Sequence, residues 1–444
     1  MNNDNIAAIS TALGAAGVAV IRISGDSPLS VAEKLFTPAG KTPVGDFEPN
    51  KMYVGEINAD GFSDYGMCVY FKAPKSFTGE DVVEFHTHGG TAIVRGVLEK
   101  ILRSGARLAE RGEFTRRAFM NGKLSLASAE GLIDMINSET ESGVRAGYAL
   151  YREKLTRKVG EMQDALLDAL SQIDADMDFP EEDLEKTSET AVTGDLEDVL
   201  ARTDALISSF KTGRVLKSGV KVGIVGKPNT GKSSVLNALL NYDKAIVSGI
   251  AGTTRDVVEG SIDYNGVRFN FYDTAGIRET DDEVENLGVK LSEKIARESD
   301  VILFVADGGA MDGEDEKIYS SVSGENCVFA VNKCDAHDYA DSRADIYVSA
   351  ATGENIEKLK EIIFEKAVGK VDTSADYLCE ERHLSALKRA RESLISALSA
   401  VGVQPLDVLS IDVKSAWESL GEITGKTATE DIIDNIFSKF CVGK

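Results

Sequence analysis

The chain has 444 residues, 43% of them apolar, which is too long for one hydrophobic core, so we expect two to four compact units. A formal net charge of −24 excludes broad, nonspecific binding of nucleic acid, which depends on positive charge, so any RNA contact has to be local. The polar start lacks a signal-peptide pattern, no apolar run reaches membrane-spanning length, and the cysteines lack metal-ligand spacing; we therefore predict a cytoplasmic protein without a disulfide framework or zinc site.

Residues 1–121 are predicted to form a compact α+β domain. Short strand-like runs at 18–23 and 67–71 alternate with Gly and Pro turns, and one helix is expected near 92–103. His86 and His88 are close enough to suggest a metal site, but no further ligands lie near them in the sequence. We therefore do not favour a metal site there.

Residues 122–216 change to a helical period and are predicted to form the first part of a helical domain. Apolar side chains recur at steps of three and four over 155–173 and again over 196–210. The acidic stretch at 174–189, which contains Pro180, separates the two stripes and is predicted to be a solvated loop or exposed turn. The first stripe consists of Leu155, Val159, Met162, Leu166, Leu170 and Ile173.

Three basic clusters interrupt the acidic composition. Each is compatible with a local RNA contact or with the solvated face of a helix, and the second interpretation is favoured because charge runs usually face solvent. The clusters are Arg111 with Arg116 and Arg117, Lys154 with Arg157 and Lys158, and Lys388 and Arg389 with Arg391.

A phosphate-binding loop is predicted at Gly226-Lys-Pro-Asn-Thr-Gly-Lys-Ser233, which fits the pattern GxxxxGK[ST]. It follows an apolar run of strand length at 220–225 and leads into a helical sequence at 234–240, the context that the pattern requires. Backbone N–H groups of Gly231, Lys232 and Ser233 would face the β-phosphate, Lys232 would reach the β and γ oxygens, and Ser233 would ligate Mg²⁺. The loop alone leaves ATP and GTP open.

Two downstream motifs and a following Ser-Ala pair select guanine. Asp273-Thr-Ala-Gly276 follows a strand-like run, where Asp273 can hold Mg²⁺ through water and Gly276 can present its N–H to a γ-phosphate. In Asn332-Lys-Cys-Asp335 the last carboxylate can accept two hydrogen bonds from guanine, a donor pair that adenine lacks. Ser349 and Ala350 follow another short strand, where a backbone N–H would meet guanine O6. Such motifs in this order predict a GTP site.

The segment at 248–256 is polar and contains glycine, which suits a switch that orders around a γ-phosphate and Mg²⁺, with Thr254 as the second Mg²⁺ ligand. Ile277 stands where Ras-like GTPases carry a water-orienting Gln, so catalysis needs another polar group and another positive charge. The candidates are Glu285, Arg278 and Asn229, the last through a monovalent cation held with loop carbonyls. The alternative is that Asn229 only shapes the loop and Glu285 is a solvated charge.

Helical periodicity returns in residues 373–444, after a GTPase unit predicted at 217–372. Each helical block is short for a stable bundle. We therefore expect the two blocks to pack together as one domain with the GTPase inserted between them, although independent helical domains are the alternative.

Four motifs together give the chain a resemblance to the MnmE (TrmE) family. They are the Phe77-Thr-Gly-Glu80 run continuing to Gly90, Arg111-Gly-Glu-Phe-Thr-Arg-Arg-Ala-Phe-Met-Asn-Gly-Lys123, Gly252-Thr-Thr-Arg-Asp256 and the terminal Cys441-Val-Gly-Lys444. The resemblance spans the whole chain. It implies an N-terminal folate-binding α+β domain, a discontinuous all-α domain and an inserted Ras-like P-loop GTPase domain.

The resemblance also implies an activity. Members of the family act as homodimers with the flavoprotein MnmG, in a heterotetramer, and modify the wobble uridine of certain tRNAs at carbon 5. They add an aminomethyl or carboxymethylaminomethyl group and draw a one-carbon unit from 5-formyl- or methylene-tetrahydrofolate. Their GTPase domains pair in the presence of K⁺, which replaces an arginine finger.

Carried over by matching motif, the resemblance assigns folate contacts to Arg22, Glu80, Lys123 and Lys444, for which surface ion pairs are the alternative interpretation. It assigns K⁺ to Asn229, Ser248, Ile250 and Thr253, Mg²⁺ to Ser233 and Thr254, and indirect positioning of the attacking water to Glu285. The GTP-binding set that we predict is Asn229, Thr230, Gly231, Lys232, Ser233, Ser234, Ser248, Gly249, Ile250, Ala251, Gly252, Thr253, Thr254, Asp273, Thr274, Ala275, Gly276, Asn332, Lys333, Asp335, Ser349 and Ala350.

The chain departs from the family at residues 12–17, where a Pro-Gly-Arg-Gly-type turn is usual and Ala-Leu-Gly-Ala-Ala-Gly is found. Cys441 has no neighbouring base in the sequence, so a positional role is favoured over a catalytic one. Two other functions share part of the signature: a ribosome-assembly GTPase, which would lack the Phe-Thr-Gly-Glu domain and the terminal motif, and a folate aminomethyltransferase with a vestigial GTPase, which would not need a complete GTP set.

Overall fold

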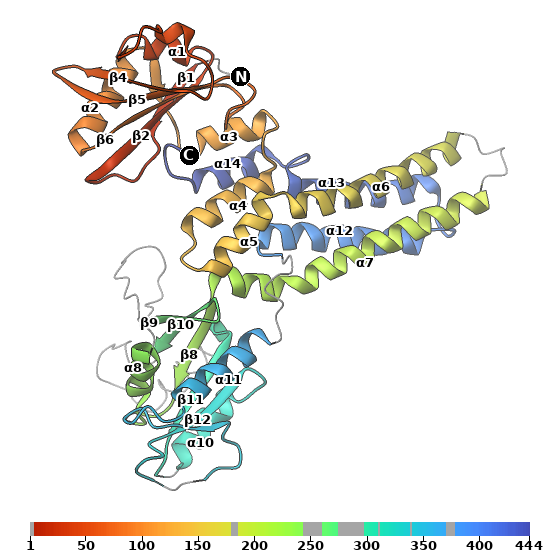
Figure 1. Ribbon diagram of the computed structural model, residues 1–444. Coiled ribbons are helices and arrows are strands. Elements are labelled where there is room, and N and C mark those ends of the chain that lie inside the picture. The colour runs from red at the N-terminus through yellow and green to blue at the C-terminus, as the bar shows by residue number, and fades with distance from the viewer. Residues whose placement is uncertain are drawn as a thin grey trace, which may run out of the picture. The chain divides into compact units, whose positions relative to one another are not determined.

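The computed structural model describes residues 4–178, 185–242, 260–273, 297–309, 311–337, 340–369 and 378–444 (Figure 1). The chain divides into two compact units. The first comprises Met1–Ile133, Leu150–Val199 and Arg389–Lys444, and the second comprises Asp134–Ala149 and Leu200–Lys388. Within the described residues, no helix is long and apolar enough to cross a membrane.

The first unit begins with a seven-stranded sheet in the order β3-β4-β5-β6-β2-β1-β7. Its strand pairs are antiparallel, except that β1 and β7 are parallel. The strands predicted at 18–23 and 67–71 lie within β2 and β5. The strands are β1 (Asn5–Ile9), β2 (Ala16–Gly25), β3 (Phe36–Pro38), β4 (Met52–Ala59), β5 (Phe62–Phe71), β6 (Asp81–Gly89) and β7 (Ala106–Leu108).

Successive residues of a strand point to opposite faces of the sheet, and the consecutive residues Ile6, Ala7 and Ala8 of β1 are all buried, so helices cover both faces there. Helices α1 (Pro28–Ala32) and α2 (Thr91–Arg103) pack on one face around buried residues such as Ile21 and Phe85. On the other face, Phe114 of α3 (Glu113–Met120) packs against β1. A short 3₁₀ turn, η1 (Val44–Asp46), completes the domain. It is the α+β arrangement that its sequence predicts.

Long amphipathic helices follow. Helix α6 (Lys154–Asp178) lies beside α13 (Leu406–Thr424), so segments far apart in sequence pack together, and Gln163 Nε2 donates to Trp417 O at 3.0 Å (Figure 1). The predicted stripe of α6 buries Val159, Met162, Leu166 and Ile173. The remaining helices of these blocks are α4 (Leu126–Asn137), α5 (Glu141–Tyr151), α7 (Glu185–Ser218), α12 (Glu381–Ala400) and α14 (Glu430–Ser438).

The prediction of a loop over 174–189 is wrong at both ends. Helix α6 continues through residues 174–178, and α7 already begins at Glu185. Ala175 and Met177 are good helix formers, and the acidic side chains of this stretch can stay solvated on a helix as well as in a loop. Pro180 lies outside the described residues.

The second unit contains a six-stranded sheet in the order β13-β12-β11-β8-β10-β9, parallel except for the β9–β10 hairpin. Helices α8 (Lys232–Tyr242) and α11 (Ile356–Val368) pack on one face, and α10 (Gly313–Val322) packs on the other. This is the predicted α/β fold of a P-loop GTPase. The strands are β8 (Val220–Val225), β9 (Gly260–Tyr264), β10 (Val267–Asp273), β11 (Val301–Asp307), β12 (Cys327–Asn332) and β13 (Ile346–Tyr347).

Candidate functional site

The predicted phosphate loop lies between β8 and α8, so its N–H groups are at a helix N-terminus. Lys232 is the first residue of α8; it is 7% exposed, and its Nζ donates to the carbonyls of Gly226 and Lys227, each at 2.8 Å. Gly231 has φ +90°, and a Cβ there would lie 2.2 Å from Asn332 Nδ2. The loop is therefore tightly curved around its own lysine, and position 231 tolerates only glycine.

Asn332 and Lys333 hold this loop from the other side of the site. Asn332 is buried; its Nδ2 donates to Thr230 O at 3.0 Å, and its Oδ1 accepts from Ala350 N at 3.1 Å. Lys333 Nζ donates to Asn229 O at 3.1 Å and to Asp307 Oδ2 at 2.5 Å. The structure thus brings together three sequence segments that we predict to contact GTP.

Asp307 is a residue of this network that the sequence analysis missed. It is the last residue of β11, directly before Gly308, and pairs with Lys333. Burial raises the pKa of its carboxyl, but the hydrogen bonds from Lys333 and from the Gly309 N–H, together with the positive charge of Lys333, outweigh burial and leave that pKa below its usual value. The sequence did contain a signal for this residue: an aspartate at the carboxyl end of a strand-like apolar run, followed by two glycines, is typical of a ligand-binding edge of a parallel sheet.

The predicted base contacts lie at the same edge of the sheet. Asp335 is exposed in the loop after β12, whereas Ser349 is buried, and its Oγ accepts from Thr352 N at 3.1 Å. The Ala350 N–H, one candidate donor to guanine O6, donates to Asn332 in this structure. Ser233 and Ser234 are exposed in the first turn of α8. The base and phosphate assignments stay predictions.

Several predicted GTP and metal residues lie outside the described residues. These are Ser248 to Thr254, Thr274 to Gly276, Arg278 and Glu285. Asp273 is described as the last residue of β10, where it pairs with Ile224 of β8, but its side chain is not described. Because Ile224 is two residues before Gly226, the backbone of Asp273 lies beside the strand end that leads into the phosphate loop.

A second cluster of predicted residues surrounds the loop at 77–80 of the N-terminal domain. Arg22 lies over the Phe77 ring, 5.4 Å from its centroid, and its Nε donates to Glu84 Oε1 at 2.7 Å. Glu80 Oε2 accepts from Ser24 Oγ at 2.8 Å. A Cβ on Gly79 would lie 3.2 Å from Lys123 Cγ, so Lys123 packs against the same loop.

Polar residues to which the sequence analysis gave no role at this site hold the loop in place. Thr78 bonds Ser24 Oγ at 2.7 Å, and its carbonyl accepts from Asn121 Nδ2 at 2.8 Å. Arg117 NH1 lies 3.2 Å from Glu80 Oε2. These partners come from β2 and from the end of α3, two segments far from the loop in sequence, which is why local sequence did not reveal them. Three predicted residues, Arg22, Glu80 and Lys123, therefore share one preformed surface.

The C-terminal tail, residues 441–444, docks on the N-terminal sheet. Val442 forms an antiparallel bridge with Arg111, and Ser10 Oγ donates to Gly443 O at 3.2 Å. Gly443 has φ +100°, and a Cβ there would lie 2.2 Å from Ile9 O. Lys444 is half-buried and Cys441 is exposed. Because β1 pairs with β2, the tail is anchored one strand away from Arg22.

The two histidines of β6 have carboxylate partners. His88 Nδ1 lies 2.6 Å from Asp64 Oδ1, and His86 Nε2 lies 3.5 Å from Glu84 Oε2. Burial raises the pKa of Glu84, but His86 and Arg22 together leave that pKa below its usual value. Over the described ranges, no group of three or more His, Cys, Asp or Glu side chains could hold a metal ion.

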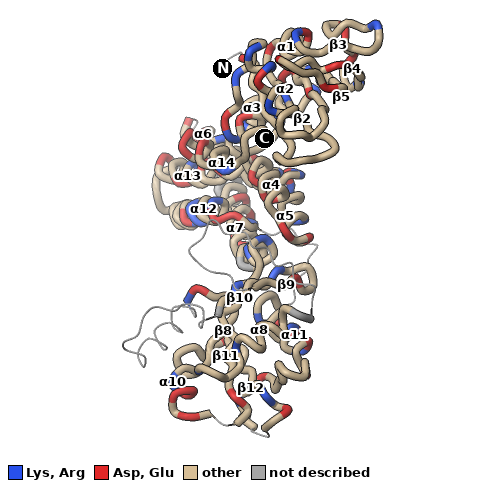
Figure 2. Tube along the Cα trace, turned by 90° about the vertical axis from the view of Figure 1, so that its left-hand side faces the viewer, with Lys and Arg blue, Asp and Glu red and all other residues tan. Residues whose placement is uncertain are grey.

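The three basic clusters differ in their surroundings. Arg116 pairs with Asp434 at 2.9 Å, and Arg389 pairs with Glu422, so parts of two clusters are neutralised by acids. Residues 154, 157 and 158 are exposed on the first turns of α6. Figure 2 shows Lys and Arg interspersed with Asp and Glu along both units. A local RNA contact stays a prediction.

Comparison with known proteins agrees with these motifs. A family model described as the MnmE helical domain matches residues 126–441, and one described as GTP-binding protein TrmE N-terminus matches residues 5–123. The tRNA modification GTPase MnmE of Heliobacterium modesticaldum is 40% identical over 472 residues, covering 100% of both chains. That of Caldicellulosiruptor saccharolyticus is 39% identical over 457 residues with the same coverage. Among solved structures, the G domain of the T. maritima FeoB iron transporter is 27% identical with a TM-score of 0.25, covering 33% of this chain and 98% of that one.

Proposed function

This chain belongs to the MnmE family of tRNA modification GTPases, and we propose that it is a K⁺-activated, dimerisation-dependent GTP hydrolase of the cytoplasm. With the flavoprotein MnmG it would use a tetrahydrofolate one-carbon unit to add an aminomethyl or carboxymethylaminomethyl group to C5 of the wobble uridine of certain tRNAs. The observation that carries the proposal is identity of about 40% along the full length of named family members. The geometry of the phosphate loop supports it.

The described GTP residues can perform distinct steps. The N–H groups at the start of α8 would bind phosphate oxygens, and Lys232 would exchange its two loop carbonyls for the β and γ oxygens. Asn332 and Lys333 would keep the loop in place during that exchange, because each bonds its backbone. Asp335 would bind guanine. In this proposal Asn332 and Lys333 fix the conformation of the phosphate loop without contacting the phosphates themselves.

The residues present fit the metal ions that the family implies. Ser233 is an exposed residue at the N-terminus of α8, and hydroxyl oxygen is a ligand type that Mg²⁺ accepts. Asn229 is exposed in the loop with φ +67°, so its amide oxygen can join loop carbonyls around K⁺. The cations would neutralise charge that develops on the phosphates. Thr254 and the remaining K⁺ ligands lie outside the described residues.

The loop at 77–80 fits a folate in its chemistry. Glu80 can accept hydrogen bonds from the amide edge of a pteridine, and Arg22, Lys123 and Lys444 can pair with a glutamyl carboxylate. The folate would supply the one-carbon unit. Because Arg117 and Ser24 already orient the Glu80 carboxylate, the acceptor is held in position before binding.

The decisive experiment is mass analysis of wobble nucleosides in tRNA from cells lacking this protein. We expect loss of the C5 modification and its recovery on expression of the wild-type chain, but not of Lys232→Ala, because that variant lacks the phosphate-binding ammonium. An unaltered nucleoside profile in the deletion strain would contradict the proposed function.

We expect Gly443→Ala to weaken binding of 5-formyltetrahydrofolate by about tenfold, the value of one charge-assisted contact. The added methyl group would collide with Ile9 O and displace Lys444. Isothermal titration of the full chain measures the affinity. Gly160→Ala is the matched control, because a Cβ at that helical position meets nothing within 4 Å. Equal affinities in the two variants would remove the tail from the folate site.

A further inference from the structure

Helix α7 runs directly into the core of the GTPase domain. Val215 and Leu216 in its last turn are buried in the cluster that includes β8 and β10. The following Gly219 has φ +79°, and a Cβ there would lie 2.6 Å from Arg268 O, so helix and strand join in a tight turn. The helix end therefore cannot move independently of the sheet that carries the phosphate loop.

A helical corner is fastened to this junction. We use the name α4–α5 corner for residues 134–149, which belong to the second unit although both helices continue without a break into the first. Ser142 Oγ donates to Leu216 O at 3.1 Å, Glu139 pairs with Arg268, and Asp134 Oδ1 lies 2.8 Å from Lys217 Nζ. Three separate contacts thus join the corner to α7 and β10.

Lys217 connects three chain segments at once. Its ammonium pairs with Asp134 of the corner and with Glu380, which precedes α12, and it stands just before β8 itself. The three side chains are only 26%, 16% and 20% exposed. Burial, reinforced by the Glu380 carboxylate, raises the pKa of Asp134 to about 7, and the two acids raise the pKa of Lys217 to about 12 against the effect of burial. Lys217 at the start of the GTPase domain and Glu380 after its end are therefore joined to the corner through the Lys217 ammonium.

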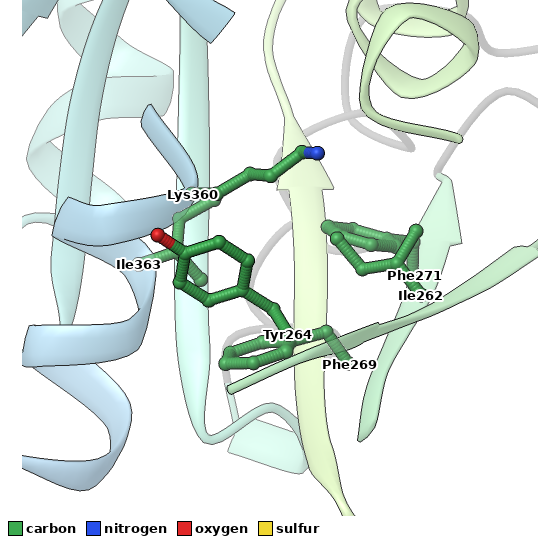
Figure 3. Close-up of a pocket in the computed structure, with 6 residues that line it drawn as sticks. All are labelled: Ile262, Tyr264, Phe269, Phe271, Lys360 and Ile363. Carbon is green, nitrogen blue, oxygen red and sulfur yellow. The ribbon is translucent and has the colours of Figure 1, made fainter. Parts of the chain in front are cut away.

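Strand β10 links the corner to the nucleotide motifs. Its side chains alternate: Phe269 and Phe271 line a small apolar hollow with Lys360 and Ile363 of α11 (Figure 3), while Arg268 pairs with Glu139. The strand then ends at Asp273, the first residue of the Asp-Thr-Ala-Gly motif. Strand β10 thus contacts the corner near its start, at Arg268, and ends at a residue that we predict to respond to the nucleotide.

We propose that the α4–α5 corner moves with the GTPase domain as one body, and that Asp134 and Glu139 are positioning residues that couple the nucleotide state to tRNA modification. This inference rests on the proposed function. A change at the phosphates reaches the corner through β10 and through the β8–α7 junction. A displacement of the corner would in turn move α4 and α5, because both helices continue without a break into the first unit.

Hydrogen–deuterium exchange of the full chain tests the proposal, with GDP and with a nonhydrolysable GTP analogue. We expect exchange in residues 134–149 to differ between the two nucleotides, because local opening free energies follow the contacts that hold a segment. In Glu139→Gln and in Asp134→Asn that difference should be lost, while GTP hydrolysis stays within about twofold of wild type. Complementation should show wobble modification reduced by a factor on the order of ten.

Controls separate this inference from simple instability. Glu139 is 53% exposed, and Arg268 keeps Asp263 at 3.5 Å, so Glu139→Gln leaves no buried charge unpaired. Glu316→Gln removes another carboxylate–arginine pair of the same unit, with Arg343, and should change neither exchange at 134–149 nor modification. A wild-type chain that hydrolyses GTP without a nucleotide response at 134–149 would overturn the coupling role alone. A wild-type chain that hydrolyses no GTP would overturn both proposals.

Discussion

Asp335→Asn should lower the affinity for GTP by a factor on the order of 10²–10³ and create affinity for xanthosine triphosphate. A carboxylate accepts two hydrogen bonds from guanine, each worth about 1.5–3 kcal/mol when charge-assisted. An amide presents a donor in place of one acceptor, which fits the carbonyl that xanthine carries there. Asp335 is exposed, and over the described ranges no hydrogen bond or ion pair engages its carboxylate, so the substitution leaves the fold intact.

Competition against a fluorescent GTP analogue measures this change in selectivity, with ATP as the ligand that neither protein should bind. Glu325→Gln makes the same carboxylate-to-amide change at an exposed position two residues before β12 and should keep wild-type affinity. Unchanged GTP affinity in Asp335→Asn would remove guanine recognition from this residue.

Much of the architecture could be predicted because its signals are local. The strand expected at 220–225 is β8, and the helix expected near 92–103 is α2. Apolar residues at steps of three and four are buried in α6 as expected. The fold class of all three parts is confirmed, since each depends on periodicity and on motifs of fixed spacing.

The contacts that hold the sites could not be predicted, because they join residues far apart in sequence. Asn332 and Thr230 are 102 residues apart, and Lys217 and Glu380 are 163 apart. Sequence spacing offered a role for Asp335 but none for Asp307 or Lys217, whose chemistry depends on tertiary neighbours. The prediction of an acidic loop over 174–189 was wrong for a different reason. Its composition indicated exposure to solvent, and an exposed acidic segment can be helical as well as a loop.

GTP hydrolysis should be at least about tenfold faster in K⁺ than in Na⁺, because a charge placed at the transition state is worth that much or more. Ile277 cannot orient water, and Asn229 is exposed in a loop whose backbone Lys333 holds at Asn229 O. Over the part of the chain that the structure describes, no hydrogen bond engages the Asn229 side chain, so its amide oxygen is available to a cation. K⁺ is larger than Na⁺, so several loop oxygens can coordinate K⁺ without having to move as close together as Na⁺ would require.

Steady-state phosphate release at several protein concentrations checks this prediction, since a dimer-dependent reaction has a specific rate that rises with concentration. Asn229→Ala should remove most of the difference between the two ions while GTP affinity stays within about threefold, because Lys232 and the loop N–H groups remain. Asn237→Ala, an exposed asparagine of α8, is the matched control and should keep the K⁺ response. Equal rates in both ions for the wild-type chain would exclude cation activation. A K⁺ response that survives in Asn229→Ala would instead move the cation to ligands other than this side chain.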